Sequence, residues 1–180
     1  MPDTFRIRPL GSLGEREIHG LSDVLIDCVE GGASVSFMLP MTRDKADDFW
    51  RAVAGSAARG ERVVLVAEDP EGRIVGTVQV VWAQPENQPH RGDVAKMLVH
   101  RRARRLGVGA ALLAAAERSA LNAGKTLLVL DTVTGGDAER MYAREGWQHC
   151  GVIPDYALWP GGGLCATTVF FKSLRARSDE

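Results

Sequence analysis

The stretch RRARRLGVG, residues 101–109, constrains the fold most strongly because of the segments on either side of it. The preceding DVAKMLV, residues 93–99, is rich in strand-forming residues, and the following AALLAAAERSALNAG, residues 110–124, predicts a helix. The chain must therefore turn here, with the helix N-terminus pointing back over the end of the strand. Gly107 and Gly109 keep side chains away from the first N–H groups of that helix, which lack intrahelical partners and carry partial positive charge.

The arginines beside this turn predict a phosphate site. Arg104 and Arg105 add planar cationic donors that suit phosphate oxygens, so the turn forms a cradle for a pyrophosphate. A dinucleotide-binding G-x-G-x-x-G loop would need a third glycine where Leu112 stands, and a Walker loop would need Gly-Lys-Ser or Gly-Lys-Thr. The pattern that fits is Arg-x-x-Gly-x-Gly after a strand.

Composition limits the other classes of protein. The chain has 180 residues, 45% of them hydrophobic and 25% charged, which predicts one globular domain over residues 1–180. The net charge of −1 does not suit a protein that coats a polyanion, so we expect no nucleic-acid partner. The alternative that the arginines of RRARR leave open is a nucleic-acid-binding module. No apolar run approaches the ~20 residues that span a bilayer, so we expect no membrane partner.

The cysteines indicate a reducing compartment. Cys28, Cys150 and Cys165 lie far apart and form no C-x-x-C pair, so neither a zinc site nor a disulfide framework is indicated. We therefore expect reduced thiols, a cytoplasmic location and no bound metal. His149 adjoins Cys150, but no third group stands at a recognisable spacing, which disfavours a cysteine nucleophile. His100 is expected to be a solvated loop residue.

The chain alternates helices and strands in the order β-α-α-β-β-β-α-β-α-β-β. The clearest signals are Thr42 as the N-cap of the second helix and the turn DPEG between two β-rich runs, which predicts an antiparallel hairpin. The expected strands cover residues 5–10, 62–68, 73–83, 93–99, 126–132, 147–153 and 165–174, and the expected helices begin at Ser12, after Thr42, at 110 and at 137. The run TLLVLDT reads as a buried strand, and RARSDE, residues 175–180, as a solvated tail.

Two segments resemble the GNAT N-acetyltransferases. KMLVHRRARRLGVGAALL is similar to their acetyl-CoA motif, with Arg104, Gly107 and Gly109 in the key positions, and RMYAREGW is similar to their tyrosine-bearing segment. The order of elements also agrees over about residues 5–172. The resemblance implies a mixed α/β fold with a mostly antiparallel sheet of about seven strands, a splayed fourth and fifth strand, and helices on both faces.

The final third of the chain resembles a narrower group, the tabtoxin-resistance acetyltransferases. The likeness rests on LDT, on the loop after the sixth strand and on the ending TTVFFK. It implies an enzyme of antibiotic resistance that acetylates a small amino-acid-like amine, such as a β-lactam antimetabolite. Three other functions stay open: acetylation of a protein N-terminus or lysine, acetylation of another drug such as an aminoglycoside, and a non-catalytic acetyl-CoA sensor. A homodimer is also open.

The GNAT resemblance implies acetyl-CoA as cosubstrate and direct attack by the acceptor amine. The implied cofactor-binding residues are Met97, Leu98, Val99, Arg104, Arg105, Leu106, Gly107, Val108, Gly109 and Thr132. The backbone of the first three would pair with the pantetheine arm, and a backbone N–H there would help polarise the thioester oxygen. The N–H groups of residues 104–109 would bind the pyrophosphate, with Arg101 and Arg102 reaching the nucleotide phosphates.

The same resemblance assigns Tyr142 as the hydroxyl that donates to the leaving thiolate. Asp131 and Asp93 are the two candidates that would accept the amine proton, directly or through water, or bind a cationic substrate. Asp131 ends an apolar strand, and Asp93 has the side-chain parity of Met97 and Val99, which would place it in the same cleft. The alternative is that Asp131 caps a turn and Asp93 is a solvated strand end. The acceptor pocket is expected to be lined by Phe37, Met38, Trp82 and Tyr156.

Overall fold

A computed structural model describes residues 5–175 and contains one seven-stranded sheet in the order β1-β2-β3-β4-β5-β7-β6. The helices are α1 (Glu15–Glu30), α2 (Arg43–Ala58), α3 (Val108–Asn122) and α4 (Asp137–Arg144). The strands are β1 (Arg6–Pro9), β2 (Arg62–Glu68), β3 (Ile74–Trp82), β4 (Arg91–Val99), β5 (Leu127–Val133), β6 (Gln148–Leu158) and β7 (Leu164–Ser173). This confirms the predicted order of elements and the α/β class.

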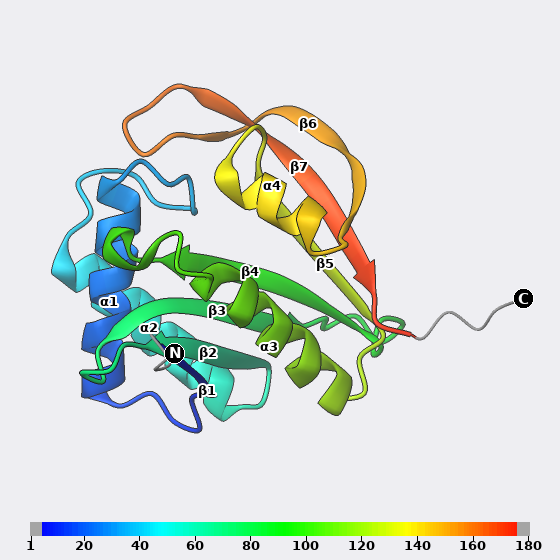
Figure 1. The fold of residues 1–180 in the computed structure, drawn as a ribbon, viewed down its shortest axis with the longest axis horizontal. Helices are drawn as coiled ribbons and strands as arrows, with labels where there is room; N and C mark the ends of the chain where they lie inside the picture. The colour runs from blue at the N-terminus through cyan, green and yellow to red at the C-terminus, as the bar shows by residue number, and fades with distance from the viewer. Residues whose placement is uncertain (1–4, 176–180) are drawn as a thin grey trace, which may run out of the picture.

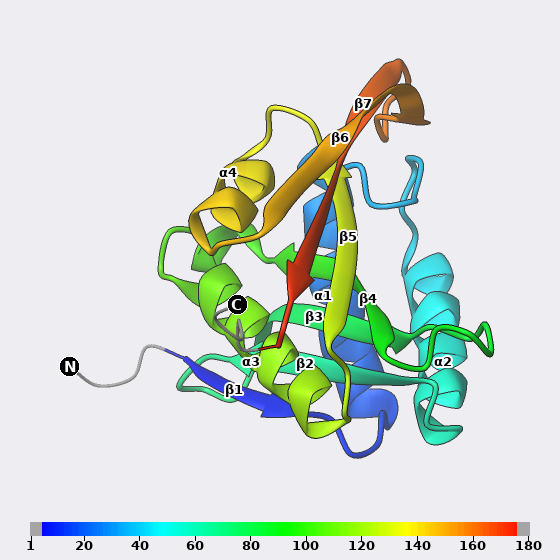
Figure 2. The same cartoon turned by 90° about the vertical axis from the view of Figure 1, so that its right-hand side faces the viewer.

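Helices cover both faces of the sheet. Figure 2 shows α3 and α4 on one side and α1 and α2 on the other, and Figure 1 shows α3 lying along the strands. Each face has its own apolar core: Trp50 and Leu98 belong to the core under α1 and α2, and Leu112 and Leu128 belong to the core under α3. Thr42 caps α2 as predicted, because its hydroxyl accepts a hydrogen bond from Lys45 N at 3.3 Å.

The sheet is antiparallel except between β4 and β5, and at that junction it comes apart. The two strands pair only over Arg91–Asp93 and Leu127–Val129 and then diverge, as the green and yellow strands of Figure 1 show. The predicted splay of the fourth and fifth strands is therefore confirmed. It leaves the edge of β4 beyond Asp93 without a neighbouring strand among residues 5–175.

β4 contains a bulge that changes which side chains share a face. Ala95 lies opposite Gln79 and Leu98 opposite Thr77, so β4 has one more residue than β3 in this interval. Val94 consequently packs in the α3 core, and Leu98 packs in the α1 and α2 core. A strand of strict period two would place these two side chains on the same face.

The bulge overturns the parity prediction for Asp93. Met97 and Val99 pack on the α3 side together with Val94, whereas Asp93 is next to Val94 in the undisturbed part of the strand and points to the opposite face. Asp93 and Met97 therefore do not face the same cleft. The sequence carries no glycine or proline at the bulge to announce it.

Several predicted boundaries shift. α1 begins at Glu15, β6 extends to Leu158, and α3 begins at Val108. β5 is not buried throughout, because Leu128 and Leu130 are buried but Asp131 is exposed. The predicted tail lies outside the described residues from 176 onward. Within residues 5–175, no helix combines the length and apolar character that crossing a membrane requires.

Candidate active site

A cleft of about 1320 Å³ opens where β4 and β5 diverge. Its walls come from β4 after Asp93, the end of β5, the N-terminal turn of α3, one side of α4 along its length, the loop of residues 31–38, and the ends of β6 and β7 that face each other. The cleft therefore joins three features that the sequence predicted separately: the strand before the arginines, the glycine turn and the tyrosine-bearing helix.

The glycine turn has a different physical requirement at each glycine. Gly107 is the N-cap of α3 and has φ 81°, a left-handed conformation that other residues adopt at a cost. A Cβ atom at Gly107 would meet nothing within 4 Å, but one at Gly109 would lie 2.9 Å from Met141 Sδ. Gly109 therefore lets α4 approach the first turn of α3, a packing role that the sequence did not reveal.

The four arginines separate into two pairs. Arg104 and Arg105 line the cleft, and Arg104 Nε donates to the Val99 carbonyl at 3.3 Å. Arg101 instead donates from its backbone N–H and from Nε to the Asp27 carboxylate, at 2.8 and 2.9 Å. The Arg102 guanidinium donates to the Ile74 carbonyl at 3.4 Å. The structure does not bring Arg101 and Arg102 to the cleft, contrary to the expectation for them.

Two other residues at this turn lie in surroundings that the sequence did not reveal. The Leu106 side chain does not line the cleft; it is 52% exposed and lies beside a small separate cavity that Arg102 also lines, and the pyrophosphate contact expected of its backbone N–H stays a prediction. His100 is not a solvated loop residue, because its Nδ1 accepts from Arg102 N and lies 3.5 Å from the Asp27 carboxylate. Burial lowers the pKa of His100, although the neighbouring Asp27 charge opposes this.

Tyr142 projects from α4 between the core and the cleft. Its ring packs on Trp147 and Phe170, with centroids 5.9 and 6.1 Å away. Only 4% of Tyr142 is exposed, and burial, aided by the negative charge of Asp131, raises the pKa of its hydroxyl well above the usual value. The hydroxyl therefore stays protonated and is available as a donor at neutral pH.

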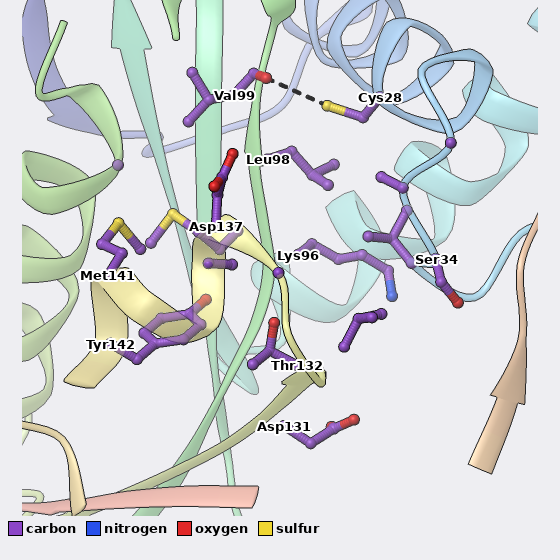
Figure 3. A pocket seen from close by; sticks show the side chains of 18 of the residues that line it. Cys28, Ser34, Lys96, Leu98, Val99, Asp131, Thr132, Asp137, Met141 and Tyr142 are labelled. Carbon is purple, nitrogen blue, oxygen red and sulfur yellow. Dashed lines mark hydrogen bonds between the residues drawn. The ribbon is translucent and has the colours of Figure 1, made fainter. Parts of the chain in front are cut away.

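The polar end of β5 lies across the cleft from α4. Asp131 Oδ2 accepts a hydrogen bond from Thr167 Oγ1 at 2.8 Å, and the same hydroxyl also lies 2.9 Å from the Thr132 carbonyl. Figure 3 shows Asp131, Thr132 and Tyr142 around one part of the cleft. Asp93 is absent from this group, since its carboxylate pairs with Arg91 at 2.5 Å and does not line the cleft.

Lys96 is a residue of the cleft that the sequence reasoning missed. It occupies the bulge of β4 with φ 50°, and its Nζ donates to Ser36 Oγ at 3.0 Å. Burial lowers the pKa of Lys96, while the Asp131 charge acts in the opposite direction. The available signal was a lysine flanked by apolar residues in AKMLV, which is unusual in a strand that lies in a core sheet.

The predicted acceptor residues are only partly brought together. Phe37, Met38 and Tyr156 line the cleft, and Phe37 packs edge-to-face against Phe49 at 5.1 Å. Trp82 lies outside it, near the end of β3, with the Lys125 ammonium 5.3 Å from its ring. Among residues 5–175, no cluster of three or more His, Cys, Asp or Glu residues is arranged to hold a metal ion.

Comparison with known proteins agrees with this geometry. A family model described as the acetyltransferase (GNAT) family matches residues 34–147, which include the glycine turn, Lys96, Asp131 and Tyr142. Over those residues the match covers more than half of the chain.

Solved structures with similar folds cover nearly the whole chain. A protein from Salmonella typhimurium assigned as an acetyltransferase, solved with its cofactor acetyl-CoA, has a TM-score of 0.77 at 16% identity and covers 98% of both chains. The ribosomal-protein-alanine N-acetyltransferase of Brucella melitensis has a TM-score of 0.76 at 22% identity, over 93% of this chain and 99% of its own. A protein assigned as a phosphinothricin N-acetyltransferase has a TM-score of 0.77 at 17% identity, over 96% and 99%. At these identities the likeness shows the shared fold.

Proposed function

Because the chain belongs to the acetyltransferase (GNAT) family, we propose that it transfers the acetyl group of acetyl-CoA to the amine of a small, amino-acid-like molecule. One observation carries the proposal: the edge of β4 that has no neighbouring strand within residues 5–175, the N-terminus of α3 and the Tyr142 hydroxyl all meet in one cleft. These are the features needed to hold an extended thioester and to assist its leaving group.

The residues of the cleft fit acetyl-CoA. The edge of β4 from Val94 to Val99 offers backbone groups to an extended pantetheine arm, in the manner of an added strand. The open side of Gly107 and the first N–H groups of α3 suit a pyrophosphate, and Arg104 and Arg105 add positive charge beside them. The Salmonella typhimurium protein with its cofactor acetyl-CoA supports this assignment through the shared fold.

Acetyl-CoA supplies an activated acetyl group, and the chain's own residues orient it and manage the proton. Tyr142 donates a hydrogen bond to the departing sulfur. A thiol has an ordinary pKa of about 8.5, below that of tyrosine, so the tyrosine stabilises the thiolate without fully surrendering its proton. Asp131 attracts a cationic amine and accepts its proton through water. Thr167 supports this role by fixing Oδ2 of the carboxylate.

The acceptor is proposed to be a small amino-acid-like amine. The neighbour assigned as a phosphinothricin N-acetyltransferase supports this class, and the tabtoxin-resistance resemblance points the same way. A role in antibiotic resistance, with a β-lactam amine as acceptor, remains the narrower hypothesis. The Brucella melitensis neighbour makes a protein N-terminus the competing acceptor, and the experiment must include it.

The test is amine-dependent release of thiol from acetyl-CoA, with the acetylated product identified by mass. The panel holds L-amino acids, phosphinothricin, tabtoxinine-β-lactam, an aminoglycoside and a peptide that begins with alanine. Asp131→Asn is compared with Asp93→Asn, which removes the same charge outside the cleft. We expect turnover with small amino-acid-like amines and a loss of about 10²-fold or more in kcat only for Asp131→Asn.

Other outcomes would revise the proposal. Turnover of the peptide alone would move the acceptor to protein N-termini and retain the chemistry. Equal losses for the two aspartate variants would remove Asp131 from its role. No thiol release with any amine, and no rise in melting temperature on adding acetyl-CoA, would refute the proposed function.

A further inference from the structure

The bulge residue Lys96 has no task in the chemistry described above, yet the fold places it in the cleft at some cost. Lys96 and its hydrogen-bond partner Ser36 are both non-glycine residues in the left-handed region, with φ 50° and 78°. Such conformations are uncommon and persist where the surrounding structure enforces them, often at binding sites. The two residues come from β4 and from the loop of residues 31–38, so their contact ties the two walls of the cleft together.

The ammonium of Lys96 is prepared to bind an anion. Its Nζ lies 5.8 Å from the centres of the Phe37 and Phe49 rings, and Ser36 Oγ accepts one of its three N–H bonds. Among the residues that the structure describes, no carboxylate lies within ion-pair distance of it. By contrast, the similarly half-buried Lys172 is held by both oxygens of Glu117 at 2.8 Å. A partly desolvated ammonium with unused donors is the arrangement that binds a charged ligand group.

The charge on the other side of the same space has the opposite sign. Asp131 lines the cleft with Lys96, and Figure 3 shows the two side chains around a common opening bordered by Tyr142 and Thr132. The Asp131 charge favours the protonated form of Lys96, and the two aromatic rings do the same, while burial opposes it and lowers its pKa. A molecule with one positive and one negative group would satisfy both residues.

We propose that Lys96 binds the carboxylate of the acceptor while Asp131 receives its amine, so that the enzyme selects α-amino acids and their analogues over simple amines. This inference rests on the proposed function and adds to it the residue that determines specificity. Phe37 then borders the acceptor through the same ring that contacts the lysine.

The test uses acceptors in matched pairs, each L-amino acid beside its α-carboxamide, which removes the negative charge and retains the amine. The full chain is compared with Lys96→Met, which keeps the length of the side chain, and with Lys96→Arg, which keeps its charge. Lys45→Met is the control, because Lys45 also lies 5.8 Å from the Phe37 ring but stands on α2 outside the cleft. Steady-state kinetics of thiol release give kcat and KM for each pair.

We expect the unsubstituted enzyme to prefer the acids. Lys96→Met should lower kcat/KM for the acids by about 10- to 100-fold, mainly through KM, and change that for the amides by less than about 2-fold. Lys96→Arg should retain part of the preference for acids, and Lys45→Met should retain all of it. Melting curves of the variants establish that each is folded.

Three results would overturn the inference, and they separate it from the proposed function. Equal losses for acids and amides in Lys96→Met would mean that the lysine only supports the structure. A preference for amides in the unsubstituted enzyme, or acetylation of Lys96 itself located by peptide mass spectrometry, would leave acetyl transfer in place and remove the anion site. No transfer to either series, with the other amines of the panel also inert, would refute both proposals.

Discussion

Tyr142→Phe separates catalysis from stability more cleanly than any other single change in the cleft. The ring lies in the α3 core and contacts Trp147 and Phe170, and phenylalanine retains all of this packing. Among the described residues no hydrogen bond joins the Tyr142 hydroxyl to a protein group, and this oxygen is not one of the buried polar atoms cut off from solvent. Removing it therefore leaves no orphaned partner behind.

These contacts determine how much each substitution should change stability and kcat. The free energy of unfolding should change by less than about 0.5 kcal/mol, because no buried hydrogen bond is lost. The kcat should fall by about 10²- to 10⁴-fold, which corresponds to ~3–5 kcal/mol of transition-state stabilisation. Tyr142→Ala is the contrasting variant, since loss of the buried ring should cost ~3–5 kcal/mol of stability.

The assays are urea unfolding and thiol release at saturating acetyl-CoA. The raised pKa of Tyr142 adds a condition: the hydroxyl should remain protonated up to about pH 10, so its ionisation should not reduce the rate below that pH. A stable Tyr142→Phe variant with unchanged kcat would refute the donor role. A loss of more than ~1.5 kcal/mol in the free energy of unfolding would show that the hydroxyl has a structural partner in the folded protein.

Three further substitutions test the scaffold around the cleft. All three are measured by urea unfolding, and Gly107→Ala is also measured by kinetics. Gly76→Ala should lose ~1–3 kcal/mol of stability, because its Cβ would lie 3.0–3.1 Å from Val108, Leu112 and the Leu98 carbonyl; an unchanged midpoint would contradict this packing. In Gly107→Ala the added Cβ would meet no atom of the described residues within 4 Å, so only the φ of 81° disfavours the alanine. We expect a loss of ~1 kcal/mol in the free energy of unfolding and a raised KM for acetyl-CoA. Asp27→Asn should lower the free energy of unfolding by ~1–3 kcal/mol at pH 7, because it removes a carboxylate that Arg101 binds. Burial raises the pKa of Asp27, but the hydrogen bonds from Arg101 and the nearby positive charges outweigh burial and lower the pKa overall. This stabilisation is present above the unfolded pKa of about 3.9 and is lost as the pH falls through the folded value, so the two proteins should converge in acid.

The sequence predicted the parts of the site that depend on local chemistry. The glycine turn, Arg104, Arg105 and the tyrosine helix were identified because their residue types and spacing carry the signal within a few positions. The sequence did not predict where four other side chains lie, because their directions depend on tertiary structure: Asp93, Trp82, Arg101 and Arg102. For Asp93, a single extra residue in β4 reversed the face of the strand. Arg101 was drawn away by Asp27, a residue 74 positions earlier in the chain.

Lys96 could not be predicted as a cleft residue, because its surroundings also depend on tertiary structure. A lysine in a strand is ordinarily placed on a solvated edge, and its contacts come from Ser36, Phe37 and Phe49 on segments distant in sequence. No pattern within β4 announces that these segments converge on it. The overall α/β order was easier to predict because turns, caps and hydrophobic periodicity are encoded within each element.

The splay between β4 and β5 leaves the two parts of the sheet joined by few backbone hydrogen bonds, so the sheet is weakest at this junction. Within residues 5–175, only three residue pairs of the ladder connect β1–β4 with β5–β7, so this junction has the fewest paired residues of any in the sheet. An extended ligand that pairs with the open edge would act as a missing piece of the ladder and join the two halves. Binding of such a ligand should then slow amide exchange throughout β5 and β7, including their residues outside the cleft, because binding to the folded state alone shifts every local opening equilibrium that breaks this junction.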